Sequence, residues 1–554
     1  MHKNSLRIGF LASAVLLSAP ALAQTDTGIE IIGLSVTEST LDEQAITEIL
    51  GGELSSHAEG LAALNAQSIT IDRIAFVSPS DEAVRVTLSG IVLANVVDGV
   101  AASVGIDSAE IVGDDGSYGN YGLLTAADLD IQAWLSMTGM IEVEPGDDLV
   151  PVFSRFDFSG GHQQFDDGKC AFGATHLGQL EIRPADWKDV ETLAEQVDLD
   201  NADIDERALS QVLSGFSLGG IDMGRWECRF IDSDGRPMRF GLGGFSTGSF
   251  TPGHWPEIEM SDFIVAVENH AEAGEVSFAT LNIGSTDYSH VLALADFDLD
   301  DQSPEAIRRS IPHFSGFSMS DARFDIPDGP GSRIAIGMDS FELALNDWFN
   351  GIPTDVSFAL TNQTLDFDFG PASLADAEMI AMLGLADTPI SMSGAMSWDR
   401  DSETIGVDSI TYKWGDLGTL SFSAGLSNAT ETLFSFDEDE MLGAFMTLGL
   451  ADFDFTAIDG GIINQFASIE AFATGGDPQK LRFELAEQAA PELTRDLPAA
   501  LAEPILSFLR GGGTLSIDGQ PVGGAPVPLL SLTALEDDAV ALFENFDIRM
   551  THTE

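Results

Sequence analysis

The feature that most constrains this chain is the alternation of apolar and polar residues along many short segments. The clearest example lies between Pro389 and Leu426. There, Ile390, Met392, Met396 and Trp398 lie at even-numbered positions, and serines lie at odd-numbered positions between them. Because successive side chains of a strand point to opposite faces, this pattern predicts strands with one buried and one wet face. Turn sequences at residues 399–402 and 415–418 divide the stretch into three strands of a β-meander.

The second strand of this meander changes its alternation partway along. Ile405 and Val407 have the opposite parity to Ile410. An extra residue in one strand of an antiparallel pair, a β-bulge, produces such a change. We therefore expect a bulge near Asp408 and Ser409.

The same period of two recurs elsewhere in the chain. It is found at Ile69 and Ile71, from Val84 to Leu88, from Val356 to Leu360 and from Leu365 to Phe369. Many antiparallel strands with one polar face fit an open sheet that is covered on one side only.

Helical patterns lie between the strands. They cover residues 203–213, 303–311, 372–383 and 438–448, and a pair of helices between 477 and 509 that is broken near Pro498. Ser303 before Pro304 is a capping residue followed by a favoured first helical residue. The predicted fold class is therefore α+β and β-dominated, with a long twisted antiparallel sheet and short helices packed on its apolar face.

A short helix, a turn of small residues and an alternating strand recur as a unit. Copies lie at residues 212–217, 292–298, 314–318 and 448–455, at irregular spacing, so this is no solenoid of fixed period. We expect one long body, with a β-rich N-terminal and central region over residues 24–386 and a C-terminal meander with helices over residues 387–554.

The N-terminal residues have the order of a secretory signal. Lys3 and Arg7 precede an apolar run from Ile8 to Leu17, and small residues follow where a signal peptidase reads. We predict a signal peptide over residues 1–23, a mature chain from Gln24, and a periplasmic location with or without outer-membrane association. After Gln24 no stretch of about 18 residues is apolar throughout, so no transmembrane span is expected.

The formal net charge of -66 is the strongest compositional signal. Such a chain repels nucleic acid and anionic membrane surfaces, so neither is an expected partner. The charge fits binding of Ca²⁺ or of a cationic partner, or else a solvated acidic surface suited to a salty medium, where screening relieves self-repulsion. We favour the solvated surface.

The chain has two cysteines, Cys170 and Cys228. An oxidising compartment favours a single disulfide between them, which would close a long loop and stabilise the fold by a few kcal/mol. Two buried thiols are the alternative. Their separation excludes a CxxC redox or zinc motif.

Two G-x-S-x-G segments make Ser217 and Ser246 candidate nucleophiles. In a hydrolase this serine sits on a strand-to-helix turn that exposes its oxygen to a histidine base. The first copy instead follows a helix and leads into a strand, and residues 316–320 repeat the pattern without the final glycine. His254 and His313 are available as bases, but nothing ties either to a serine. We therefore expect no enzyme, with a serine hydrolase as the remote alternative.

Two acidic segments resemble calcium loops and lack required residues. Residues 296–301 have Asp301 where a helix–loop–helix site needs Gly, and residues 198–203 have Ala202 at a ligand position. Calcium at a different acidic turn stays open. With no paired-histidine pattern and no phosphate-cradling glycine loop, no metal ligand and no cofactor is predicted.

The C-terminal third, from about Asp387, contains Tyr412-Lys413-Trp414, Gly415–Phe422 and Gly513–Ile517. With these residues it resembles a family of uncharacterised exported β-rich envelope proteins of alphaproteobacteria. The resemblance implies export and a β-rich fold, and it implies no known activity. The strand alternation is also similar to that of the AsmA-like group, long envelope proteins that shelter lipid in a groove.

Together these features predict a non-enzymatic periplasmic protein that binds an apolar, lipid-like ligand or an envelope partner in a groove of its sheet. The reason is the surplus of one-faced strands, whose apolar side is either covered by helices or partly open to acyl chains. The alternative is a structural or interaction protein with a closed core and an acidic surface, with or without calcium.

Overall fold

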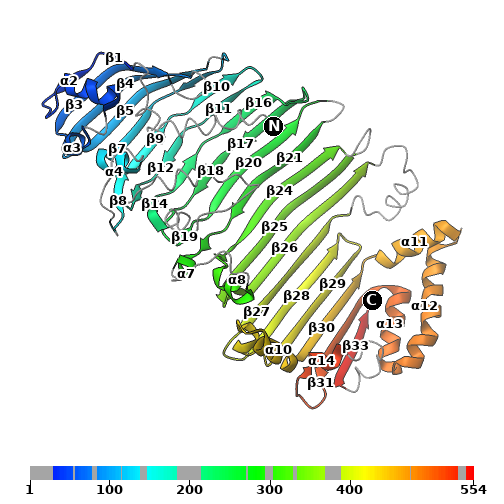
Figure 1. Cartoon of the computed structure of the whole chain (residues 1–554). Coiled ribbons are helices and arrows are strands. Elements are labelled where there is room, and N and C mark those ends of the chain that lie inside the picture. Colours follow the sequence, from blue (N-terminus) through cyan, green and yellow to red (C-terminus); the bar gives the residue numbers. More distant parts are fainter. Residues whose placement is uncertain are drawn as a thin grey trace. The chain divides into compact units, whose positions relative to one another are not determined.

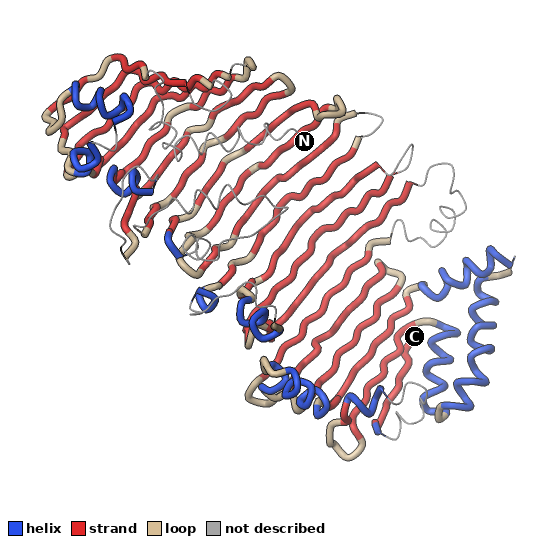
Figure 2. The backbone as a smooth tube through the Cα atoms, viewed as in Figure 1, coloured by secondary structure: helices blue, strands red, loops and turns tan. Residues whose placement is uncertain are grey.

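The computed structural model describes residues 29–53, 57–77, 84–113, 115–137, 146, 148–183, 214–269, 273–292, 303–327, 333–368, 388–474, 476–533 and 545–554. The chain divides into two compact units. Unit 1 comprises Met1–Glu272 and Ser285–Asp300, and unit 2 comprises Ala273–Gly284 and Asp301–Glu554. Antiparallel strands dominate the described part of both units, with short helices between them (Figures 1 and 2), so the predicted fold class is confirmed.

Unit 1 begins with long strands built from the predicted alternating segments. The elements in chain order are β1 (Glu30–Ile32), β2 (Ser35–Thr37), β3 (Ala66–Val77), β4 (Arg85–Val97) and β5 (Val100–Val112). Both β1 and β2 pair with β3, which pairs with β4, and β4 pairs with β5. Ile71, Ile91 and Ile106 stand opposite one another in this register and share one face.

Beyond β5 the sheet of unit 1 continues as two rows of short strands. One row is β6 (Tyr118–Tyr121), β10 (Gly161–Phe165), β11 (Gly168–Phe172), β16 (Trp226–Ile231) and β17 (Pro237–Leu242). The other is β7 (Leu124–Asp130), β9 (Arg155–Phe158), β12 (Thr175–Leu177), β15 (Ile221–Met223) and β18 (Gly244–Thr247). Both rows start on β5 and end on β20 (Ile258–Val267).

Glycines mark the line along which the two rows separate. The chain crosses from one row to the other next to Gly122, Gly160, Gly173, Gly224 and Gly243. At Gly173 a Cβ atom would lie 2.7 Å from the backbone nitrogen of Arg225, and the Gly173 N–H donates to the Arg225 carbonyl. Small residues are required here because two backbones approach closely.

The core of unit 1 forms where short helices meet the first strands. These helices are α2 (Glu43–Glu48), the π-helical turn η2 (Ile49–Glu53), α3 (Ala58–Ala62) and α4 (Ile131–Met137). Leu64, Ile69, Val96 and Leu135 are buried together in one cluster. Helices this short are not stable alone in water, so this packing against the sheet holds them in place.

Three smaller groups complete unit 1. A small sheet contains β8 (Val150–Phe153), β13 (Leu180–Ile182) and β14 (Phe216–Leu218), and a second pairing joins β19 (His254–Trp255) to β22 (Thr286–Asp287). The helix α7 (Ser289–Leu292) follows β22.

Unit 2 is an antiparallel sheet whose strands mostly follow chain order. Its pairing order is β21 (Gly274–Ile283), β24 (Gly316–Pro327), β25 (Arg333–Phe349), β26 (Ile352–Asp368), β27 (Ile390–Asp399), β28 (Thr404–Trp414), β29 (Gly418–Ser427), β30 (Gly449–Asp459), β31 (Gly513–Pro521) and β33 (Phe546–Thr553). The short strand β32 (Val527–Pro528) pairs with β30, and the short strand β23 (His313–Phe314) precedes β24 in the chain without joining this sheet. The predicted meander is confirmed as β27, β28 and β29.

Single residues with a left-handed backbone let the long strands of unit 2 change parity. The non-glycine residues with positive φ inside these strands are Asp321, Asp347, Asn362 and Ser409. At Ser409 the φ angle is 48° and the register of β28 against β29 shifts between Val407 and Ile410. The predicted bulge is therefore confirmed. Asp and Asn tolerate this conformation because their short polar side chains bond locally.

The helices of unit 2 lie between strands. They are α8 (Pro304–Ser310), the 3-10 turn η4 (Glu431–Phe434), α10 (Glu438–Thr447), α11 (Ile462–Thr474), α12 (Pro478–Asp496), α13 (Ala499–Gly511) and α14 (Leu529–Thr533). The Ser303 hydroxyl accepts from the Ala306 N–H and caps α8, as predicted. The helices predicted at 303–311 and 438–448 and the pair between 477 and 509 are confirmed.

Several predicted features lie outside the described residues. They are the signal peptide, the helices at 203–213 and 372–383, the acidic segments 198–203 and 296–301, and the region boundary at 387. The strands on either side of that boundary, β26 and β27, pair directly through Val356 and Met396.

Candidate functional site

The candidate site is the apolar face of the unit 2 sheet, which we define by rows of side chains that stand opposite one another on successive strands. One row runs through Leu281, Met319, Phe341, Leu360, Met392, Tyr412, Leu420, Ala457 and Leu515. A second runs through Leu345, Val356, Met396, Val407, Ala424 and Phe453. Residues paired across antiparallel strands share a face, so these rows form one continuous apolar surface.

The opposite face of the same strands is polar. A row there contains Ser393, Thr411, Ser421, Thr456 and Ser516. The Thr411 and Ser421 hydroxyls lie 3.2 Å apart and form a hydrogen bond. The sheet of unit 2 therefore presents one wet face and one apolar face, as the alternation predicts.

Large side chains on the apolar face are substantially exposed. Met396 is 42 % exposed, Ile410 41 %, Leu420 48 % and Phe422 39 %. They come from three consecutive strands, β27, β28 and β29, and Ile410 pairs with Phe422. Scattered exposed hydrophobic residues are common on proteins, but adjacent ones on one sheet face make a patch of the kind used to bind apolar partners.

Helix α13 packs against β31 and β33 at one end of the unit 2 sheet (Figure 1), and side chains of the first row are more buried there. Ala457 and Leu515, which follow Leu420 in the first row, are each 6 % exposed. Leu501 and Leu506 of α13 are also buried. Part of the apolar face is thus covered by a helix, and the part on β27 to β29 is exposed.

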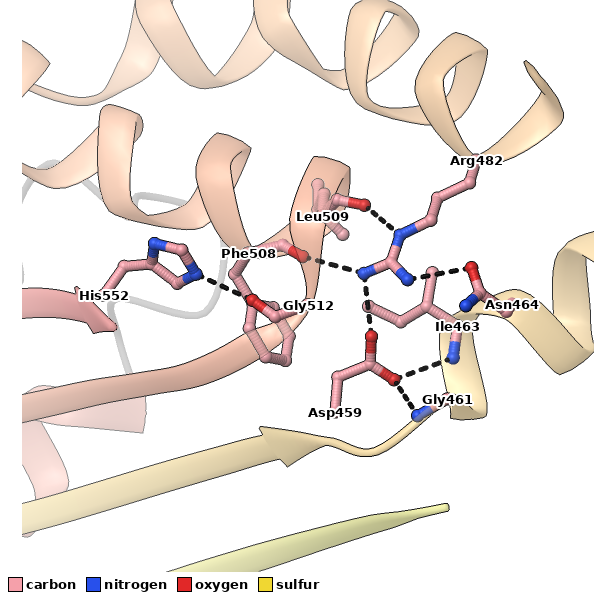
Figure 3. A network of polar contacts seen from close by, with 9 residues as sticks. All are labelled: Asp459, Gly461, Ile463, Asn464, Arg482, Phe508, Leu509, Gly512 and His552. Atoms are coloured by element: carbon pink, nitrogen blue, oxygen red, sulfur yellow. Dashed lines mark hydrogen bonds and ion pairs between the residues drawn. The ribbon is translucent and has the colours of Figure 1, made fainter. Parts of the chain in front are cut away.

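A buried ion pair fixes the helices at this covered end (Figure 3). Asp459 ends β30, and its Oδ2 accepts from Arg482 Nη2 of α12 at 2.7 Å. Its Oδ1 accepts from the backbone N–H groups of Gly461 and Ile463 and so caps α11. The side chains of Asp459 and Arg482 are 1 % and 8 % exposed.

The Arg482 guanidinium also holds the end of α13 (Figure 3). Its nitrogens donate to the carbonyls of Phe508 and Leu509 and to Asn464 Oδ1. A cation at a helix C-terminus satisfies carbonyls that have no partner within the helix and interacts favourably with the helix dipole. One side chain thereby connects β30, α11, α12 and α13.

Aromatic side chains from the ends of β25 and β27 pack against an aromatic side chain of η4. Trp398 and Phe434 have ring centroids 4.2 Å apart, and the Trp398 indole N–H donates to the Ala429 carbonyl. Phe349 contacts both rings. Nearby, a hydrogen bond from the Arg400 guanidinium lowers the pKa of Glu431. These contacts position the turns at one end of the apolar face.

The predicted nucleophiles have other surroundings. Ser217 stands opposite Glu181, and Ser246 stands between Asp222 and Glu259 on the polar face of unit 1. Among the described residues, neither serine forms a hydrogen bond to a histidine.

The histidines proposed as bases also lie in other contacts. His254 stands opposite Asp287, and the His313 ring stacks on Trp348 with centroids 5.1 Å apart. The G-x-S pattern has a structural explanation at Gly316, where φ is 118° and a Cβ atom would overlap the carbonyl of Leu343.

Cys170 and Cys228 form a disulfide between neighbouring strands of unit 1. They stand opposite each other on β11 and β16, with Cα atoms 4.1 Å apart. The Trp226 indole N–H donates to Cys228 Sγ at 3.1 Å. The bond fits an oxidising compartment.

Within the part of the chain that the structure describes, no cluster of three or more His, Cys, Asp or Glu side chains is arranged to hold a metal ion. No described helix combines the length and apolarity needed to cross a bilayer.

Sequence reasoning missed the Asp459–Arg482 pair and the exposed part of the apolar face. The only signal for the pair was an isolated arginine among the apolar positions of a predicted helix. The exposed part depends on the register between strands, which the alternation does not encode.

Comparison with known proteins adds one finding. A family model described as an uncharacterized protein matches residues 411–553, from β28 to β33, which include Asp459 and Arg482. No curated protein and no solved structure matches the chain. The match agrees with the resemblance of the C-terminal third to an uncharacterised family, whereas the alphaproteobacterial origin and the likeness to the AsmA-like group stay predictions.

Proposed function

We propose that this chain is a non-enzymatic protein of the bacterial periplasm that binds the acyl chains of a lipid on the apolar face of unit 2. The observation that carries the proposal is the exposure of Met396, Ile410, Leu420 and Phe422 on a face whose first row continues to Leu515 of β31, the strand on which α13 packs. The disulfide supports export to an oxidising compartment.

The shape of the rows suits an extended hydrocarbon chain. Neighbouring strands lie about 4.8 Å apart, so rows that cross the unit 2 sheet extend over roughly 40 Å. Each methylene removed from water contributes about 0.8 kcal/mol. Met392 and Met396 add flexible side chains that adapt to a mobile ligand.

The polar face also supports binding of the ligand on the apolar face. Ser, Thr and Asp side chains keep that face hydrated, so the two faces differ in the solvent they favour. An acidic chain with formal net charge -66 is also kept away from anionic membrane surfaces, so a lipid would be carried as a bound molecule.

The experiment combines native mass spectrometry with a neutral fluorescent probe. Gently purified full-length protein is expected to carry co-purified lipid and to enhance the fluorescence of N-phenylnaphthylamine. The double variant Met396→Gln, Phe422→Gln places polar groups on the apolar face and should weaken probe binding about tenfold or more.

The matched control is Ser397→Gln, Ser423→Gln, which changes the neighbouring residues on the polar face of the same strands. This control should bind the probe as the wild type does. Equal probe binding by both double variants, together with a lipid-free mass for the wild type, would refute lipid binding on this face.

One observation favours the alternative of an interaction protein with a closed core. In unit 1 the corresponding apolar residues Ile69, Ile71, Ile91 and Leu124 are all buried. A protein that only packs against a partner would show no saturable probe binding in the same assay.

A further inference from the structure

A cluster of basic side chains lies on the polar face of unit 1. Lys169 of β11 stands opposite Arg229 of β16, which stands opposite Arg239 of β17. Arg225 adds a fourth cation next to this row. The clustering is unexpected, because the whole chain has 24 basic residues against 90 acidic ones.

Among the described residues, Glu227 is the one carboxylate within ion-pair distance of Arg225, Arg229 and Arg239. Glu227 lies between Arg225 and Arg229 in the sequence, and its carboxylate oxygens are 3.3 Å from Arg225, 3.7 Å from Arg229 and 4.0 Å from Arg239. No ion pair of Lys169 is present among the described residues. In the described part of the chain, the three arginines of the cluster therefore share a single carboxylate partner.

The arrangement of this basic row indicates that it serves a ligand. Like charges directly opposite one another on neighbouring strands destabilise a sheet, so the row from Lys169 to Arg239 has a cost that folding alone does not explain. An anion with several oxygens, bound by the exposed side chains of Arg225 and Arg229, would offset this repulsion.

We propose that Lys169, Arg225, Arg229 and Arg239 form a site for the phosphate group of a small soluble molecule. Guanidinium groups match phosphate oxygens with paired hydrogen bonds, and an ammonium group adds a point charge. The side chains of Arg225 and Arg229 are 68 % and 57 % exposed, so a ligand can reach them.

The surroundings favour a small phosphate over an anionic membrane surface. The turns next to the cluster contain Asp166, Asp167, Asp232 and Asp234. A flat anionic surface would meet these carboxylates, whereas a small ligand contacts the basic row alone. Screening over about 8 Å at physiological ionic strength limits repulsion from the rest of the chain.

The test is isothermal titration calorimetry with inorganic pyrophosphate at constant ionic strength, on the full-length protein. Wild type is expected to bind with saturable heat. Arg229→Gln and Lys169→Gln should each weaken binding about tenfold, the value of one lost charge-assisted hydrogen bond. Both side chains are exposed, and circular dichroism verifies the fold of each variant.

Two further variants separate a local site from a general charge effect. Arg400→Gln changes the net charge by the same amount at a site in unit 2 and should leave pyrophosphate binding unchanged. Glu227→Gln removes the competing carboxylate and should tighten binding several-fold. If the cluster had a purely structural role, this change would not increase the affinity for pyrophosphate.

The proposal is overturned if wild type shows no saturable pyrophosphate binding, or if Arg400→Gln weakens binding as much as Arg229→Gln does. Binding to phosphatidylglycerol vesicles without binding to pyrophosphate would also overturn it, because the cluster would then recognise a lipid surface. Lipid binding on the apolar face of unit 2 is measured separately, so failure of either proposal leaves the other intact.

Discussion

Arg482 and Asp459 form a buried ion pair that joins the end of strand β30 to helix α12, with a distance of 2.7 Å between Arg482 Nη2 and Asp459 Oδ2. The remaining donors of Arg482 reach Asn464 and the last carbonyls of α13. Because the donor nitrogens of Arg482 all have acceptors, we interpret this network as one that holds the helices against the sheet.

Replacing Arg482 with Met should strongly destabilise the protein. The change leaves the Asp459 carboxylate buried without its cation, which costs about 3–5 kcal/mol. Urea unfolding of the full chain measures the loss. The double variant Arg482→Met, Asp459→Asn should recover part of it, because no unpaired charge then remains.

Lys480→Met is the matched control, two positions earlier in the same helix. Lys480 pairs with Glu484 on the surface, so its loss should cost less than about 1 kcal/mol. Equal destabilisation by the two Met substitutions would show that the buried pair does not hold the helices.

Removal of the disulfide should destabilise unit 1. Cys170 and Cys228 are 58 residues apart in sequence, and closing a loop of this length is worth about 4 kcal/mol in the chain-entropy description. The double variant Cys170→Ala, Cys228→Ala should therefore unfold at lower urea concentration. A reductant should have the same effect on wild type and no further effect on the variant.

Tyr121 should make the fold sensitive to alkaline pH. Burial raises the pKa of Tyr121 to about 12, whereas an unfolded tyrosine titrates near 10. The folded state thus favours the neutral phenol. Its contribution to the free energy of unfolding is complete below about pH 10 and is lost as the pH rises toward 12. The difference amounts to about 3 kcal/mol.

The chain has four tyrosines, which makes a spectrophotometric phenolate titration easy to resolve. Tyr121→Phe should remove the phenol that ionises last. The free energy of unfolding of the variant should therefore fall less steeply between about pH 10 and pH 12 than that of the wild type. If the high-pH part of the titration is the same in wild type and variant, Tyr121 is not the buried phenol.

Gly316 should not tolerate a side chain. Its φ angle of 118° is one that other residues rarely adopt, and a Cβ atom would overlap the Leu343 carbonyl on the paired strand. Gly316→Ala should therefore lower the free energy of unfolding by about 1–3 kcal/mol. Thermal unfolding measures the change.

Gly443 provides the contrasting substitution. It lies in helix α10, and a Cβ atom there meets no other atom within 4 Å. Gly443→Ala should stabilise the protein by up to about 1 kcal/mol, because Ala is the better helix former. Equal effects at the two glycines would contradict the role of Gly316 in the recurring G-x-S segment.

Some local elements of this fold could be predicted from the sequence. The parity change between Val407 and Ile410 predicted the bulge at Ser409, and Ser303 before Pro304 predicted the start of α8. Each of these features depends on residues that are neighbours in the chain. A strand alternates because one face is wet, and a helix begins where a side chain caps its free N–H groups.

The candidate sites required the tertiary structure. Leu420 and Leu515 have the same place in an alternating pattern, yet one is 48 % and the other 6 % exposed, because α13 packs against the strand of Leu515. Lys169, Arg229 and Arg239 meet only through the register of three strands. Thus, for the alternating segments, the sequence by itself determined which residues form strands and which side chains share a face. The pairing register and helix packing decided which of those faces stay open, since both depend on contacts between residues far apart in the chain.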